Sequence, residues 1–170
     1  MNKRTPAYLV LKSAVLFLSL LCFYPLSATN PQKKEMKELN VKKVSLANVA
    51  VENIPALLDK EKVAFQSINT VNWKTFPYQP EVQFRIAHTD DAILVHYKVK
   101  EASVRAVAAG DNGAVWEDAC VEFFSIPAGD GIYYNVECNC AGILLIGAGA
   151  GRENREHAPQ EVMDKVQRWS

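Results

Sequence analysis

The central part of the chain alternates apolar and polar residues, which is the period of a β-strand. In residues 82–88 every second position is apolar, and residues 93–99 repeat the pattern. The turn-forming sequence Thr-Asp-Asp at residues 89–91 separates the two runs. Two such runs joined by a short polar turn predict a β-hairpin with one apolar face and one mainly polar face.

More strand-like runs follow toward the C-terminus. Residues 120–126 (CVEFFSI) are rich in β-branched and aromatic types, residues 132–140 alternate, and residues 142–150 are apolar and glycine-rich. Turn-forming residues 127–131 (PAGDG) separate the first two runs. Helical spacing is weak and confined to Val162, Val166 and Trp169. Many short strands separated by turns predict an all-β fold, specifically an antiparallel β-sandwich.

The first 28 residues have the pattern of a secretory signal peptide. Lys3 and Arg4 provide a positive start, and residues 13–26 are uncharged and mostly apolar. This run is shorter than the roughly 20 residues of a transmembrane helix, and Pro25 interrupts it. Small residues then follow at positions 27 and 28, as at a cleavage site. We therefore expect a signal peptide at residues 1–28.

The leader predicts that the mature protein acts outside the cytoplasm, in the periplasm, in the medium or on the outer surface. Lipid attachment at Cys22 is a less favoured variant, because bulky Leu21 precedes the cysteine. The Lys/Glu-rich residues 29–40 predict a flexible linker, and residues 41–170 predict the folded domain. The chain ends within ordered-looking sequence, so we expect this domain to be incomplete at its C-terminus.

Charge narrows the range of partners. Nineteen Lys and Arg residues balance nineteen Asp and Glu residues, so the formal net charge is zero. A basic patch large enough to attract nucleic acid or an anionic membrane is not indicated. We expect no nucleic-acid partner and, once the leader is removed, no membrane partner.

Three cysteines follow the leader, at Cys120, Cys138 and Cys140. The odd number leaves at least one thiol free or paired with another chain. One interpretation is a disulfide from Cys120 to one of the other two cysteines. The other is that all three are buried and act as small apolar residues. No C-x-x-C pair is present and the three histidines are scattered, so no metal site is predicted. Calcium is the alternative cofactor, bound by the loop aspartates Asp90, Asp91, Asp111, Asp118 and Asp130.

Motifs of catalysis are missing from the sequence. It contains no G-x-S-x-G, H-E-x-x-H or phosphate-binding loop. Four carboxylates could provide an acid/base pair for glycoside cleavage, but their spacing in three dimensions cannot be read from the sequence: Glu117, Asp118, Glu122 and Glu137. We therefore expect a protein that is not an enzyme.

Trp116 is the most informative aromatic residue. It follows a loop rich in Gly, Asp and Asn and precedes a strand-like run. A tryptophan at the mouth of a strand can expose one ring face, and the C–H face of a pyranose ring packs well on indole. Neighbouring carboxylates and amides would then orient the hydroxyls. The competing reading is a tryptophan packed in the core.

The sequence around Trp116 resembles a known family. Residues 116–124 (WEDACVEFF) are similar to the W-E-x-D-S-V-E-I-F motif of family 9 carbohydrate-binding modules. The upstream hairpin and the run Y-Y-N-V-E-C-N match the positions of that family's strands, and the segment R-W-S at residues 168–170 is similar to secreted family-9-like proteins of gut Bacteroidetes. The resemblance covers residues 64–170.

This resemblance implies a jelly-roll-type sandwich related to the DOMON superfamily. Members of the family bind sugars between two tryptophans, of which Trp116 matches the first; the second lies beyond the end of this chain. Asn135 and Glu137 fall at polar ligand positions, although the residue types differ. The expected ligand-binding residues are Trp116, Glu117, Asn135 and Glu137.

The resemblance therefore implies non-catalytic carbohydrate binding by aromatic stacking, in support of polysaccharide breakdown or uptake outside the cytoplasm. The ligand would be an oligosaccharide or a polysaccharide. The alternatives are a structural or interaction domain that binds no sugar, a module of a glycoside hydrolase, and a heme-binding domain whose axial ligands would come from His88, His96 or Met163.

Overall fold

The computed structural model describes residues 38–46 and 49–170. The predicted signal peptide, the lipid-attachment variant at Cys22 and most of the predicted linker lie outside the described residues. The residues from Leu39 onward form one unit. In this described part of the chain, no helix has the length and apolar character needed to cross a membrane.

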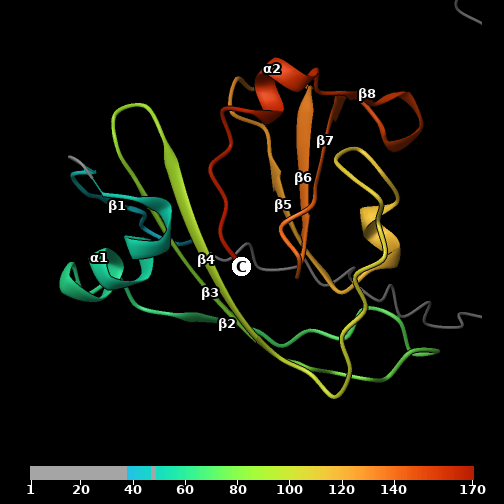
Figure 1. The fold of residues 1–170 in the computed structure, drawn as a ribbon, viewed down its shortest axis with the longest axis horizontal. Coiled ribbons are helices and arrows are strands. Elements are labelled where there is room, and N and C mark those ends of the chain that lie inside the picture. The colour runs from blue at the N-terminus through green and yellow to red at the C-terminus, as the bar shows by residue number, and fades with distance from the viewer. Residues whose placement is uncertain (1–37, 47–48) are drawn as a thin grey trace, which may run out of the picture. The chain divides into compact units, whose positions relative to one another are not determined.

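The predicted hairpin is confirmed and forms the centre of the first sheet (Figure 1). Strands β3 (Glu81–His88) and β4 (Ile93–Lys100) pair antiparallel along their whole lengths. Strand β2 (Gln66–Ile68) pairs antiparallel with the first half of β3. Strand β1 (Lys42–Lys43) pairs with the end of β3 but runs parallel to it, because a long helical connection separates the two strands in sequence.

The second sheet contains the remaining strands in chain order. Strands β5 (Cys120–Ser125), β6 (Tyr133–Asn139), β7 (Leu144–Gly149) and β8 (Glu156–His157) are all antiparallel neighbours. The turn between β6 and β7 is tight. Its Gly142 has a φ of +80°, a conformation that favours glycine, and the side-chain oxygen of Asn139 accepts hydrogen bonds from two backbone amides of the turn. The turn therefore sets the register of β6 against β7.

A short helix covers the outer face of the first sheet. The 3-10 turn η1 (Val51–Asn53) leads into α1 (Ile54–Lys60), whose Leu58 is fully buried. Leu58 packs in a cluster with Ala87 and Leu94 from β3 and β4. Beside this cluster, the buried Arg85 donates to Asp59 of the helix at 2.6 Å. This helix was not predicted from the sequence.

The C-terminal residues cover part of the second sheet. Helix α2 (Gln160–Met163) is a single turn, and its Met163 is buried against Leu144 and Ile146 of β7. The weak helical spacing noted in the sequence includes Trp169, but Trp169 is 66% exposed and lies beyond the helix. This segment is held in place by the burial of Met163 against β7 and not by an apolar stripe along a longer helix.

The two sheets form two layers (Figure 1). They contact through Tyr97 of β4, whose hydroxyl donates to the backbone oxygen of Glu122 in β5 at 3.1 Å. Helices are few and short, and antiparallel pairing dominates. The predicted all-β sandwich is confirmed.

Leu58 offers a test of the α1 interface. Leu58→Ala should lower the free energy of unfolding by about 2–5 kcal/mol, because the substitution leaves a cavity against Ala87 and Leu94. Val104→Ala is the control, since Val104 is 63% exposed, and its effect should stay within about 0.5 kcal/mol. Denaturant unfolding measures both, and equal midpoints for the two variants would contradict the packing described here.

Candidate functional site

Register divides the second sheet into an apolar face and a polar face. Cys120, Glu122 and Phe124 of β5 lie opposite Asn139, Glu137 and Asn135 of β6. Paired residues point to the same side of a sheet, so these six side chains share one surface with Tyr133 at the far end of β6. We call this surface the polar face. The other side of β6 and β7 contributes Val136, Leu144 and Ile146 to the core around Met163.

Two buried side chains form the centre of the polar face. Asn135 is 1% exposed and Glu137 is 4% exposed. The amide nitrogen of Asn135 donates to one carboxylate oxygen of Glu137 at 2.6 Å. The amide oxygen of Asn135 and the second carboxylate oxygen of Glu137 are also buried, and neither has a hydrogen-bond partner among the described residues. The centre of the face therefore holds two acceptors that lack a donor, which is costly unless a bound group satisfies them.

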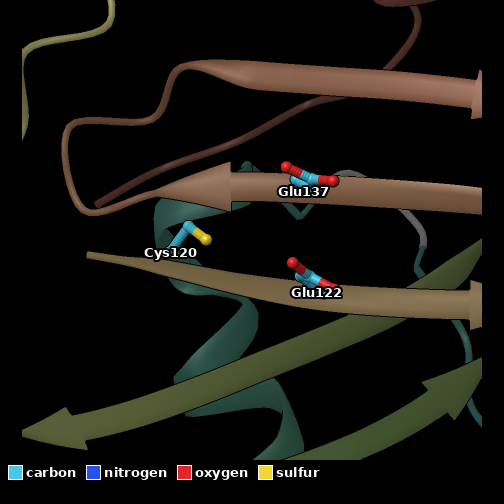
Figure 2. Close-up of side chains that lie close together, drawn as sticks. All are labelled: Cys120, Glu122 and Glu137. Atoms are coloured by element: carbon cyan, nitrogen blue, oxygen red, sulfur yellow. The ribbon is translucent and has the colours of Figure 1, made fainter. Parts of the chain in front are cut away.

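Glu122 lies directly across the strand pair from Glu137 (Figure 2). Partial burial and the negative charge of Glu137 raise the pKa of the Glu122 carboxyl, while Arg155 and Arg152 act against this shift. Like charges facing each other across two strands destabilise the pair. In residues 38–46 and 49–170, neither Glu122 nor Glu137 forms an ion pair.

Cys120 completes the group. Its sulfur, one carboxylate oxygen of Glu122 and one of Glu137 all lie within 4.8 Å of one another. Burial, followed by the charges of Glu122 and Glu137, raises the pKa of the Cys120 thiol to about 11. The thiol is therefore protonated at neutral pH when no cation is bound.

The β7 edge of the polar face is crossed by the segment before β8. A Cβ at Gly147 would meet the Arg155 side chain at 3.5 Å, and a Cβ at Gly149 would meet the backbone oxygen of Asn154 at 2.6 Å. The two glycines leave room for this segment. The Arg155 guanidinium then lies 5.9 Å from the ring centre of Tyr133. Tyr133 also contacts Phe124, which is 55% exposed.

Asp118 attaches the preceding loop to the other end of the face. Its side chain is buried and accepts hydrogen bonds from Asn139 and from the backbone amides of Val107 and Ala108, each at 2.9 Å. The hydrogen bond from Ala108, with further ones from Val107 and Asn139, holds the pKa of this carboxyl below its usual range. The loop that carries Trp116 is thus fixed relative to β6.

Trp116 is exposed rather than packed in the core. It lies in the 3-10 turn η2 (Val115–Glu117), which contacts β5 and β6. Val115 is fully buried and holds the turn, while Trp116 is 56% exposed. An exposed indole beside a strand is the arrangement expected from the sequence; its role in stacking stays a prediction.

The other predicted site residues separate into two groups. The structure brings Asn135 and Glu137 into contact at the centre of the polar face. Glu117 is exposed, and within the described residues its side chain makes no hydrogen bond. Glu122 and Cys120 were absent from the predicted binding set. Their signal was the two-residue spacing in C-V-E, which places both on one face of a strand, but the strand opposite could not be identified from the sequence.

The three cysteines that the structure describes are all free thiols, so the structure contains no disulfide from Cys120 to either of the others. Cys120 lies on the polar face, whereas Cys138 lies on the apolar side of β6. The expectation of three buried cysteines is wrong: Cys120 and Cys138 are only partly buried, and Cys140, which follows the end of β6, is exposed.

The residues suggested for calcium or heme have other contacts. Asp111 accepts from the backbone of Leu144 and pairs with Arg168, and Asp90 pairs with Lys43. His96 accepts from Arg85, and Met163 is buried in the core. A hollow of about 600 Å³ near the β3–β4 turn is lined by Asp90 and Asp91, but by none of the predicted sugar-binding residues.

Comparison with known proteins identifies relatives of the domain. The profile of "Carbohydrate-binding family 9" matches residues 52–170. The chain is also similar to the crystal structure of a proposed carbohydrate-binding protein from Bacteroides uniformis, with 63% sequence identity and a TM-score of 0.74. That match covers 77% of this chain and 61% of the solved chain, so this chain spans less than two thirds of the relative. A comparison with curated proteins finds no match.

The facing carboxylates predict an unusual pH dependence. Folding raises the pKa of Glu122, so its contribution to stability is present below its unfolded pKa of about 4.5 and is lost as the pH rises through the folded pKa. Glu122→Gln should therefore unfold at a higher denaturant concentration than the wild type at pH 7, and the difference should shrink as the pH falls toward 4.

The measurement uses urea unfolding in buffer that contains a chelator, so that no cation screens the pair. Glu117→Gln is the matched control, because Glu117 is exposed and lacks a facing carboxylate in the described residues, and its midpoint should equal that of the wild type. A Glu122→Gln midpoint at or below that of the wild type at pH 7 would contradict the repulsion.

Proposed function

Because this chain belongs to carbohydrate-binding family 9, we propose that it binds an oligosaccharide or a polysaccharide at the polar face and does not cleave it. The name of its relative from Bacteroides uniformis supports the same ligand class. Trp116, Asn135 and Glu137 carry the contacts in this proposal.

One observation carries the choice of surface. Asn135 and Glu137 each present a buried acceptor without a donor, and exposed aromatic rings lie on or beside the same sheet at Phe124 and Trp116. Sugar hydroxyls are donors that satisfy carboxylate and amide oxygens, and the C–H faces of pyranose rings pack on aromatic rings. A sugar is therefore a ligand that meets both requirements at once.

The arrangement of carboxylates favours binding over cleavage. Retaining glycosidases separate their two carboxyl groups by about 5–5.5 Å, and inverting enzymes by about 6.5–9.5 Å. In this chain the nearest oxygens of Glu122 and Glu137 lie within 4.8 Å, and Glu137 is held by Asn135. The hydrogen bond from Asn135 fixes the orientation of Glu137, and a carboxylate fixed in this way suits the binding of a hydroxyl.

Export follows from the leader in this proposal. With a signal peptide at residues 1–28, the domain reaches glycans outside the cytoplasm and supports their breakdown or uptake. Glu117 lies next to Trp116 in sequence, and in this proposal it contributes at most a solvent-screened contact, since its side chain is exposed.

Stacking on Trp116 is tested by substitution. The wild type should bind at least one member of a glycan array, and Trp116→Ala should abolish that binding while leaving the thermal midpoint unchanged, because the indole is already 56% exposed. Trp116→Phe keeps a smaller ring and should retain part of the binding. Loss of the fold in Trp116→Ala would make the residue a packing residue, and an array without any binding by the wild type would contradict the function.

Glu137 is tested against its exposed neighbour in the predicted set. Glu137→Gln should weaken binding of the array-identified glycan by about 10–100-fold, since a hydrogen bond to a charged acceptor contributes about 1.5–3 kcal/mol. Glu117→Gln is the control and should bind like the wild type. Isothermal titration calorimetry gives both affinities, and an equal effect of the two substitutions would contradict a role for the buried carboxylate.

A further inference from the structure

Cys120, Glu122 and Glu137 converge from two adjacent strands (Figure 2). One ligand-type atom from each side chain lies within 4.8 Å of the other two. Cys120 and Glu122 are two apart on β5, and Glu122 is paired with Glu137 on β6, so the sheet itself holds the three groups in place. The same positions would be lost if the register of β5 shifted by a single residue.

The two carboxylates of this cluster form no ion pair with any described residue. They face each other across β5 and β6. Arg152 and Arg155 are close enough to act on Glu122 through space, but they do not pair with it. A bound cation would remove the repulsion between the two carboxylates.

A second observation points to a bound group at the same place. Glu137 is only 4% exposed, and its Oε2 atom is buried without a hydrogen-bond partner in the part of the chain that the structure describes. The Oδ1 atom of Asn135 is likewise unpartnered in a side chain that is 1% exposed, and this amide contacts Glu137. Buried acceptors of this kind are rare in folded proteins and require an explanation, such as an ion.

The donor atoms select the class of ion. Calcium and magnesium take oxygen ligands, and a thiolate is a poor partner for them. Zinc accepts cysteine sulfur and carboxylate oxygen together, at about 2.3 Å and about 2.0–2.2 Å. We propose that Cys120, Glu122 and Glu137 bind a zinc-class divalent cation, with the Asn135 side-chain oxygen or water as the fourth ligand. When the metal binds, the Cys120 thiol loses its proton to solvent and the sulfur forms a bond to the metal.

This site goes beyond carbohydrate binding and is tested without sugar. The purified chain is titrated with Co²⁺ alone, because cobalt replaces zinc in thiolate sites and gives a thiolate-to-cobalt charge-transfer band in the near ultraviolet. The wild type should develop this band and saturate at one equivalent, and added Zn²⁺ should abolish it. Absence of the band in the wild type would overturn the proposal. A band that persists after Zn²⁺ is added would overturn it as well.

The cysteines provide matched variants. Cys120→Ser should lose the band, whereas Cys140→Ser should keep it, since Cys140 is exposed and lies beyond the end of β6. Glu122→Gln keeps the thiol but removes a carboxylate ligand. Loss of a residue that only supports a metal ligand lowers metal affinity by about 10–100-fold, so Glu122→Gln should weaken Co²⁺ binding by at least this factor. A band that persists in Cys120→Ser and disappears in Cys140→Ser would place the metal elsewhere and overturn the assignment.

Discussion

The pairing of Glu122 with Glu137 across β5 and β6 is the constraint on which the candidate site depends. It follows from a register that buries Val136, Leu144 and Ile146 with Met163 on one side of the sheet. Since side chains alternate along each strand, burying that apolar set forces the acidic pair onto the opposite face. The core therefore determines where the two carboxylates meet.

The polar face is costly for the fold and useful for binding. Two facing carboxylates and two buried acceptors without donors each oppose folding, and Asn135 compensates only in part through its hydrogen bond to Glu137. Such a surface gains free energy when a ligand supplies donors or positive charge. A glycan hydroxyl supplies hydrogen-bond donors, and a divalent cation supplies positive charge. The same face therefore supports both proposals.

The loops at either end limit what can reach the face. Asp118 attaches the Trp116 loop to Asn139, and Arg155 crosses Gly147 toward Tyr133. Both attachments use buried or closely packed atoms, so the segments that carry Trp116 and Arg155 are held against the second sheet. Fixed groups lose less entropy when a ligand binds, so the loops favour recognition.

The sequence by itself determined the hairpin of β3 and β4, strands β5, β6 and β7 of the second sheet, and a family resemblance centred on residues 116–124. These are local patterns, and alternation or a contiguous motif is readable along the chain. The tertiary structure alone decided that Glu122 faces Glu137, that Cys120 joins them and that β1 runs parallel to β3. Each of these depends on which strand lies beside which and in what register, and such pairings between distant residues leave no mark in the period of either strand.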